Sequence, residues 1–150
     1  MSENAIIKSQ IDQLTRSFFS LFTNTNNTVL AIENIYQLCI PEAIIIKNIG
    51  TNPEIYTLAQ FIEPRKKILT DGTLTGFSEE EIEERTEIYG NIAHRFCSYK
   101  KSGILSDQPF EAKGMKTIQF IHTAGGWKIS SVVWDDERAG LPNPEGYFKG

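Results

Sequence analysis

Apolar side chains recur every three or four residues along the start of the chain. An α-helix has about 3.6 residues per turn, so this spacing places them on one helix face, with polar residues elsewhere. Ser2 stands just before the pattern and can accept a hydrogen bond from a free amide of the first turn. The sequence therefore predicts an amphipathic helix that begins after Ser2. Its inner face carries Ile7, Ile11, Leu14, Phe18 and Leu21.

A second helix is predicted after the polar loop at residues 24–28, whose last members can cap it. Pro41 would end this helix because proline has no backbone N–H to donate. Residues 43–49 follow, and their β-branched, almost continuously apolar sequence is typical of a buried strand. The inner side of the second helix would carry Val29, Ile32, Ile35 or Tyr36, and Cys39.

A third helical segment is predicted from about Glu54 to the turn at Asp71 and Gly72. Pro64 lies inside it, where the ring removes a hydrogen bond and crowds the preceding turn. We expect a kink at Pro64 or two short helices. The inner positions of this segment are Leu58, Phe61 and Ile62.

The later part of the chain has the spacing of strands. Two runs rich in β-branched and aromatic residues flank Gly125 and Gly126, and paired glycines supply the positive φ angles of a tight hairpin turn. We expect this hairpin, residues 114–138, to lie in the middle of the sheet. Residues 102–113 contain a glycine and a proline and are predicted to form a loop.

The acidic residues 79–87 are compatible with two structures. They are good helix formers, yet their apolar and polar residues also alternate at strand period. The turn at Gly90 and Asn91, followed by the alternating residues 92–101, favours a β-hairpin. The acidic run would then be a solvated strand at the edge of the sheet.

Length and charge limit the kind of protein and partner. The chain has 150 residues, of which 40% are hydrophobic and 23% charged, as in an ordinary globular domain. We expect one domain over residues 1–150, with an irregular tail from about residue 139. The net charge of −4 argues against nucleic-acid or anionic-membrane partners, because both require a clustered positive field.

Motifs for metal or cofactor binding are missing from the sequence. Cys39 and Cys97 have no second thiol or histidine at zinc-ligand spacing, and we interpret them as buried free thiols of a reducing compartment. Phosphate-binding glycine loops and serine-elbow motifs are also absent. No stretch is long enough to cross a bilayer, and the start of the chain has no secretory signal. We therefore expect a cytoplasmic protein without cofactor or metal.

Three helical segments followed by long antiparallel strands favour an α+β fold in which a curved sheet wraps around helices. This order resembles the nuclear transport factor 2-like superfamily. Gly90 with Ala93 is similar to its glycine turn and alanine strand start, and residues 126–129, Gly-Trp-Lys-Ile, are similar to its final strand. The segments 68–77 and 114–120 are similar to uncharacterised bacterial members of the SnoaL-like branch.

The resemblance implies a cone: N-terminal helices packed in a strongly curved antiparallel sheet, with a pocket at the open end. It also implies a homodimer made by sheets that pack back to back. It does not transfer an activity, because this scaffold hosts isomerases, dehydratases, cyclases and non-catalytic modules. The catalytic residues of ketosteroid isomerase and scytalone dehydratase have no match at corresponding positions of this sequence.

Strand parity and the resemblance together nominate ligand-binding residues. A two-residue hairpin loop puts Ile118, Phe120, Trp127 and Ile129 on one apolar face, and Gln119, Lys128, Val132 and Trp134 on the other. In relatives with polar groups in the cavity, those groups fall at positions that resemble Tyr99, Gln119 and Trp134. The mixed face is therefore predicted to line a pocket. The nominated ligand-binding residues are Arg95, Tyr99, Gln119, Trp134 and Asp136.

Each nominated side chain also has a structural explanation. Trp134 and Tyr99 can be ordinary packing at a sheet end, and Asp136 can belong to a solvated strand end. A buried Arg95 needs either a carboxylate or an anionic ligand, and the possible carboxylates are Glu33, Glu63, Asp135 and Asp136. His94 and His122 fall on the apolar face, which favours packing or interface roles over general-base catalysis.

Two hypotheses remain open at this point. The first is a small-molecule-binding protein with an internal, partly apolar pocket for a hydrophobic ligand, working as a lyase, isomerase or cyclase of SnoaL-like type. The second is a non-catalytic dimerising interaction module with a vestigial pocket. An enzyme requires at least one titratable group that converges on a deep cavity, whereas a module can have its cavity filled by side chains.

Overall fold

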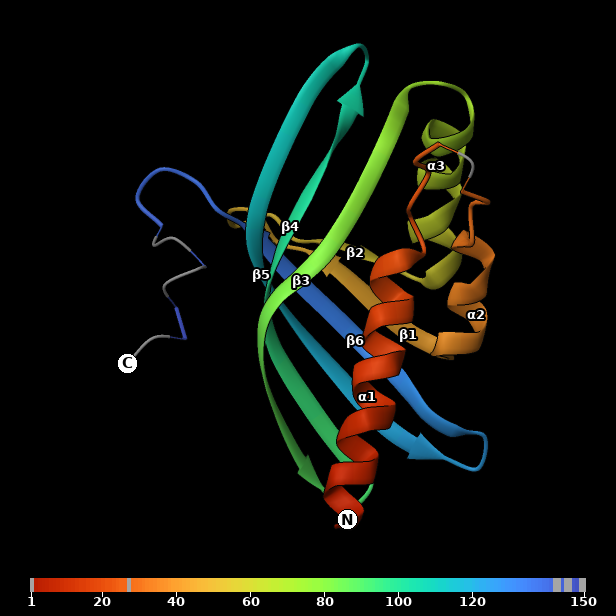
Figure 1. Cartoon of the computed structure of the whole chain (residues 1–150), viewed down its shortest axis with the longest axis vertical. Coiled ribbons are helices and arrows are strands. Elements are labelled where there is room, and N and C mark those ends of the chain that lie inside the picture. Colours follow the sequence, from red (N-terminus) through yellow and green to blue (C-terminus); the bar gives the residue numbers. More distant parts are fainter. Residues whose placement is uncertain (1, 27, 142–143, 145–146, 149–150) are drawn as a thin grey trace.

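The computed structural model describes residues 2–26, 28–141, 144 and 147–148. In this part of the chain, four helical segments lie against one six-stranded curved sheet (Figure 1). The helical segments are α1 (Glu3–Ser20), η1 (Ile32–Asn34), α2 (Ile35–Leu38) and α3 (Leu58–Thr70). The strands are β1 (Cys39–Lys47), β2 (Glu54–Tyr56), β3 (Leu74–Tyr89), β4 (Ile92–Leu105), β5 (Gln108–Thr123) and β6 (Gly126–Asp136).

The sheet has the strand order β2-β1-β6-β5-β4-β3. All neighbours are antiparallel except β1 and β6, which run parallel. The predicted α+β fold with a strongly curved sheet is confirmed, with this one parallel pair as an exception to the expected antiparallel pattern. The β5–β6 hairpin lies inside the sheet, as expected, because β6 pairs with both β5 and β1.

Helix α1 lies along the concave face of the sheet (Figure 1). The Ser2 hydroxyl accepts a hydrogen bond from the Ala5 amide, so the predicted cap is confirmed. Ile11 and Phe18 are buried on the inner side of the helix, and the sheet supplies the matching apolar surface through its inward residues. These are Ala93, Ile118, Phe120, Ile129 and Val132.

The second predicted helix is much shorter than expected. It ends at Leu38, Cys39 already belongs to β1, and Val29 is 87% exposed. Pro41 lies inside β1, between Cys39 and Ile44, where the register against β6 shifts. The missing N–H of a proline is tolerated at such an irregularity, because the ladder has no regular hydrogen bond there.

Helix α3 begins later than predicted and is a single helix. Residues 54–56 form β2 and pair with the end of β1, so the helix starts after Thr57. Thr57 and Gln60 form a capping box, in which each side chain accepts a hydrogen bond from the other's backbone amide. Pro64 lies inside the helix, which runs unbroken to Thr70. The end at Asp71 and Gly72 is as predicted, and Gly72 has a φ of +90°.

The predicted loop at residues 102–113 is wrong. Strand β4 continues to Leu105, and β5 begins at Gln108. Ser106 and Asp107 connect them, both with positive φ, which is the backbone of a tight primed hairpin turn. Because this turn carries no glycine, its sequence signal is weaker than that of the Gly90 and Gly126 turns.

Strand β6 ends at Asp136, and the described residues from 137 onward form no further strand. The predicted irregular tail agrees with this where residues are described, and its positions 142–143, 145–146 and 149–150 lie outside the described residues. Tyr147 and Phe148 lie against Phe96, whose ring packs edge-on against Tyr147. None of the described helices is long and apolar enough to span a membrane.

Candidate functional site

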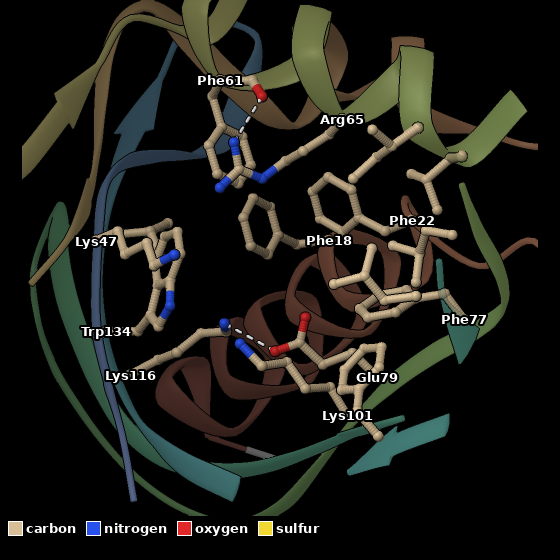
Figure 2. A pocket seen from close by; sticks show the side chains of 16 residues that line it. Phe18, Phe22, Lys47, Phe61, Arg65, Phe77, Glu79, Lys101, Lys116 and Trp134 are labelled. Carbon is tan, nitrogen blue, oxygen red and sulfur yellow. Dashed lines mark hydrogen bonds and ion pairs between the residues drawn. The ribbon is translucent and has the colours of Figure 1, made fainter. Parts of the chain in front are cut away.

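A cavity of about 270 Å³ lies between the helices and the concave side of the sheet, toward the ends of β4 and β6 (Figure 2). Helices α1 and α3 form its apolar wall, and five strands contribute to the opposite wall. An engineered cavity of about 150 Å³ is large enough for benzene, so this one has room for a ring and a polar substituent. It is lined by Phe18, Phe22, Lys47, Phe61, Arg65, Ile68, Leu69, Leu74, Phe77, Glu79, Lys101, Leu105, Phe110, Lys116, Val132 and Trp134.

Aromatic rings form a continuous chain along one wall of this cavity. The ring centroids of Phe18 and Phe22 are 6.1 Å apart, those of Phe22 and Phe61 5.7 Å, and those of Phe61 and Trp134 5.8 Å, all in edge-on arrangements. Edge-on pairs are favourable because the positive ring edge meets the negative ring face. The wall is therefore shaped to receive another planar, apolar group.

Asn24 holds the segments at the mouth of the cavity together. Its amide nitrogen donates to the carbonyls of Leu69 and Leu74, and its amide oxygen accepts from the Phe77 amide. The side chain thus joins the end of α1, the end of α3 and the start of β3. A half-buried amide with these three hydrogen bonds fixes the relative position of the elements that line the cavity.

Lys116 and Glu79 form an ion pair in the cavity wall. The lysine ammonium lies 2.8 Å from a Glu79 carboxylate oxygen, and the two side chains are only 6% and 8% exposed. The same ammonium lies 4.2 Å from the ring centroid of Tyr99 and 4.8 Å from that of Trp134. These contacts hold Lys116 as a fixed cation, because the carboxylate and the ring faces all favour its charged form.

Lys101 and Tyr99 share a second carboxylate, that of Asp136. The Lys101 ammonium lies 3.2 Å from one Asp136 oxygen, and the Tyr99 hydroxyl donates a hydrogen bond to the same oxygen. Burial lowers the pKa of Lys101, with added repulsion from Lys116 and opposed by attraction to Asp136. Burial and the bond to Asp136 raise the pKa of Tyr99, so its hydroxyl stays a neutral donor.

Arg65 and Lys47 also reach the cavity, and the salt bridges of the described residues include none from either side chain. The Arg65 guanidinium lies 3.9 Å from the ring centroid of Phe61 and donates to the Phe61 carbonyl. Figure 2 places Arg65 on the side of the cavity opposite Lys101, Lys116 and Glu79. Cationic groups therefore stand at both ends of an aromatic wall.

The cavity has an excess of positive charge and one buried donor without a partner. Among the described residues, four cationic side chains line it. Lys116 pairs with Glu79 and Lys101 with Asp136, whereas Arg65 and Lys47 have no salt bridge within this part of the chain. Trp134 is 7% exposed, and its indole N–H has no hydrogen-bond acceptor among the residues that the structure describes. An unsatisfied buried donor is costly, and a ligand oxygen can satisfy it. The arrangement suits a planar anion.

Three of the five nominated ligand-binding residues lie at or near this cavity. Trp134 lines it directly. Tyr99 is fully buried behind Lys116, and Asp136 anchors Lys101. These positions place Tyr99 and Asp136 as supports of cavity lysines rather than as wall residues. That any of them binds a ligand stays a prediction.

Arg95 lies in a separate cluster between α1 and the edge strand β3. It is 4% exposed and forms ion pairs with Asp12 at 2.6 Å and with Glu81 at 2.5 Å, while Glu84 lies 3.6 Å away. The expectation that a buried Arg95 has a carboxylate partner is correct, but the four proposed partners, Glu33, Glu63, Asp135 and Asp136, are wrong. The acidic run supplies two of the true partners.

The acidic run forms the predicted edge strand, but it is not solvated throughout. A bulge between Glu81 and Glu84 shifts the register against β4, so both residues point to the concave side. Glu79, Glu81 and Glu84 are 8%, 20% and 24% exposed. The buried cations Arg95 and Lys116, together with the partly exposed Lys8 of α1, explain why these carboxylates lie inside.

Gln119 is on the wrong side of the sheet for the predicted pocket. It is exposed on the outer face, where it lines a shallow hollow with His94. Strand alternation is interrupted in β6 because Ser130 is an extra residue: Gln119 pairs with Ser131, and Phe120 with Ile129. This bulge turns Val132 and Trp134 inward, onto the same side as Ile118 and Phe120.

Both histidines lie away from the cavity. His94 is exposed and pairs with Glu87 at 2.7 Å, and His122 stacks on Trp127 with 5.2 Å between ring centroids. Cys39 and Cys97 are buried and free, and burial raises the pKa of the Cys39 thiol to about 12. The described residues hold no group of three or more metal-ligating side chains.

Sequence reasoning missed the basic residues of the cavity. Lys116 alternates with Ile118 and Phe120, and a lone lysine on an otherwise apolar strand face is a signal that it is buried with a partner. Lys101 has the parity of Tyr99, so the same argument that nominated Tyr99 also points to Lys101. The convergence of Arg65 from α3 has no comparable local signal.

Comparisons with known proteins yield a fold and no sequence relative. No family model matches the chain, and no curated protein matches it. The chain is similar in structure to a nuclear transport factor 2-like superfamily protein from Salmonella enterica, with a TM-score of 0.72, 16% identity, and coverage of 98% of this chain and 99% of that chain.

Two further solved structures extend this likeness. One is a nuclear transport factor 2-like protein with a cystatin-like fold from Novosphingobium aromaticivorans, with a TM-score of 0.67, 11% identity and coverage of 97% and 91%. The other is the association domain of CaMKII from C. elegans, with a TM-score of 0.61, 11% identity and coverage of 85% and 93%. The resemblance inferred from the sequence is confirmed at the level of architecture: this chain has the nuclear transport factor 2-like, cystatin-like cone fold.

Proposed function

We propose that this protein binds a small aromatic acid in the cavity between α3 and the concave side of the sheet. The observation that carries the proposal is the combination of an aromatic wall with four cationic side chains, of which Arg65 and Lys47 have no salt bridge among the described residues. An apolar pocket with a few convergent polar groups is the usual form of a small-molecule site. Because the cavity has an excess of positive charge, we expect it to prefer a ligand that combines an apolar ring with a negative charge.

Arg65 is the best candidate to bind the carboxylate of such a ligand. Its guanidinium is planar, and no salt bridge of the described residues occupies it. Stacking on Phe61 fixes the plane of the guanidinium. The side chain therefore loses little further conformational entropy when it binds a carboxylate through two parallel hydrogen bonds. The ring of the ligand would then pack against Phe22 and Trp134.

Titration with para-methylbenzoate, followed by calorimetry and by tryptophan fluorescence, tests the proposal. Binding should be measurable, and para-methylbenzyl alcohol, which has the same ring and no charge, should bind at least about tenfold more weakly, because a charged hydrogen bond is worth about 1.5–3 kcal/mol. Arg65→Met should weaken the acid and leave the alcohol unchanged. Lys67→Met removes a charge from the exposed side of the same helix and is the matched control. Equal binding of acid and alcohol would contradict the proposal.

A second function is supported by the outer face of the sheet. Tyr89 and Ile92, beside the β3–β4 turn, are 84% and 60% exposed. Ile121 and Ser130 line the hollow next to them on the same face. An exposed apolar patch is typical of an interaction surface, and its occupant would be a second copy of this chain, as in a sheet-to-sheet homodimer.

Light scattering tests self-association through this face. Ile92→Glu should convert a dimer into a monomer, because a buried unpaired charge opposes the interface. Ile6→Glu, on α1 and 48% exposed, is the control and should leave the mass unchanged. A wild-type protein that is monomeric at high concentration would exclude the homodimer.

A further inference from the structure

Two lysines of the cavity point toward the same region, and their surroundings differ. Figure 2 shows the side chains of Lys101 and Lys116 extending toward Glu79 from neighbouring strands. Lys116 pairs with Glu79 and faces the rings of Tyr99, Trp134 and, at 5.4 Å, Phe19. Every one of these contacts stabilises its ammonium form.

Lys101 has fewer contacts that stabilise its charge. Its ion-pair partner among the described residues is Asp136, at 3.2 Å, and that carboxylate also accepts a hydrogen bond from the Tyr99 hydroxyl. The Tyr99 ring centroid lies 5.5 Å from the ammonium, and Glu79 adds a weaker attraction. The side chain is 20% exposed and close enough to Lys116 to be repelled by it. Proximity of a second cation and removal from water are the two ways in which proteins prepare a lysine amine as a nucleophile.

We infer that Lys101 forms an imine with the carbonyl group of an aromatic oxo-acid bound in the cavity. The inference rests on the proposed function, since the aromatic wall and Arg65 would hold the ring and the carboxylate of that ligand. It adds a chemical class, an aldehyde or ketone on the side of the ring opposite the carboxylate. The opposed positions of Arg65 and Lys101 in the cavity define that arrangement (Figure 2).

The chemistry requires only the protein and the ligand. Lys101 gives its ammonium proton to the Asp136 carboxylate, and the neutral Nζ attacks the carbonyl carbon. A C–N bond forms as the carbonyl π pair moves to oxygen, and a proton passes from the now positively charged nitrogen to that oxygen to give a neutral carbinolamine. The C–O bond then breaks, the nitrogen lone pair forms the C=N bond, and the hydroxyl leaves as water with the proton returned by Asp136. Nothing is oxidised or reduced, and hydrolysis reverses the steps.

The neighbours of Lys101 have defined parts in these steps. Asp136 of β6 moves the proton, and Tyr99 of β4 holds the Asp136 carboxylate by a hydrogen bond. Lys116 of β5 is held 2.8 Å from Glu79 of β3, and its charge both disfavours the ammonium of Lys101 and stabilises the developing oxyanion. The Trp134 N–H, which has no acceptor in the described part of the chain, is a further donor for that oxygen.

Reductive trapping tests the inference. The wild-type protein is incubated with para-formylbenzoate and sodium cyanoborohydride, which reduces an imine to a stable amine. We expect one adduct, with the mass of the ligand less one oxygen atom, and peptide mapping should place it on Lys101. Labelling of Lys101 should exceed that of its neighbour Lys100, which is 41% exposed and does not line the cavity, by roughly tenfold or more, because the bound ligand holds its carbonyl beside Lys101 alone.

Two variants act as a matched pair. Lys101→Arg keeps the charge beside Asp136 and cannot form an imine, so the adduct should disappear while the circular dichroism spectrum stays the same. Lys100→Arg makes the same exchange on the other face of β4 and should leave the adduct unchanged. Label spread evenly over surface lysines, or absent from Lys101, would overturn the inference.

Para-methylbenzoate separates this inference from the proposed function, because it has the acid and the ring without the carbonyl. If it binds and no Lys101 adduct forms, the imine is refuted and the binding function stands. If it does not bind and no adduct forms, both fall. If an adduct forms on Lys101 and its yield does not fall when excess para-methylbenzoate is added as a competitor, the imine is supported and the acid-binding site is refuted.

Discussion

Replacement of Arg95 by methionine tests whether this buried arginine is a structural residue. Arg95 is 4% exposed and contacts Asp12 and Glu81, with Glu84 close by. Methionine has a similar length and no charge. The change therefore keeps much of the packing and leaves three carboxylates that point into one cluster.

The expected loss of stability follows from what remains in the cluster. Removal of one partner from a buried ion pair costs about 3–5 kcal/mol, because the other charge stays desolvated. Here the carboxylates are 20–32% exposed, and Lys8 still pairs with Asp12 at 2.7 Å and with Glu84 at 2.9 Å. Water and Lys8 thus compensate for part of the loss. We expect a decrease near the low end, about 3 kcal/mol.

Urea unfolding followed by tryptophan fluorescence measures this loss: the urea concentration at the midpoint should fall, while the dependence of the unfolding free energy on urea concentration stays the same. Lys8→Met is the control: its side chain is 34% exposed, and a partly solvated pair contributes about 1 kcal/mol or less. Para-methylbenzoate binding should be unchanged in folded Arg95→Met protein, because Arg95 does not line the cavity. A loss below about 1 kcal/mol, or loss of binding without loss of fold, would refute a structural role for Arg95.

Three further changes test the local structure. Gly114→Ala should lower the free energy of unfolding by about 1–3 kcal/mol or more, because the added Cβ would lie 2.6 Å from Tyr99 Cζ in a packed region. Urea unfolding measures this loss, and a neutral result would be inconsistent with that packing. Thr57→Ala should cost about 1 kcal/mol through loss of the α3 cap, and Thr57→Ser should restore it. Burial acts to raise the pKa of Asp12 and Glu84, but hydrogen bonds from Lys8, and ion pairing with Arg95, hold both below their ordinary values of 3.8 and 4.5. These two carboxylates therefore stabilise the fold at pH values above their ordinary pKa values, and this stabilisation is lost as the pH falls through their lower folded pKa values. The free energy of unfolding should decline below about pH 4.5, and the decline should be smaller in Asp12→Asn.

The helices and hairpins with strong local signals could be predicted from the sequence. The apolar spacing of α1 and the cap at Ser2 are local properties, as is the glycine turn between β3 and β4. The turn at Ser106 and Asp107 was missed because neither residue is a glycine, and its geometry is imposed by the two long strands that it joins. Residues 54–56 resemble the start of α3 in sequence, but they form a strand that pairs with β1. This pairing depends on contacts between distant segments and not on the local sequence.

The candidate site depended on two bulges that no local pattern reveals. Strand parity placed Tyr99 correctly, because β4 is regular over that stretch against β5. It was wrong for Gln119, because the extra residue Ser130 interrupts the alternation of side chains in β6, so that Ile129 and Val132 face the same side of the sheet. A bulge adds one residue to one strand only, and its position is decided by packing against neighbours.

Those same bulges explain why charged residues line the interior. The irregularity in β3 brings Glu81 and Glu84 to the side where Arg95 lies, and the irregularity in β6 brings Trp134 next to Lys116. A desolvated cation is tolerated only with a carboxylate or an aromatic face beside it. In the Arg95 cluster each of the three carboxylates has an ion-pair partner, so that cluster stabilises the fold. In the cavity, Lys116 and Lys101 pair with Glu79 and Asp136, and the positive charge of Arg65 and Lys47 is what a ligand would have to balance.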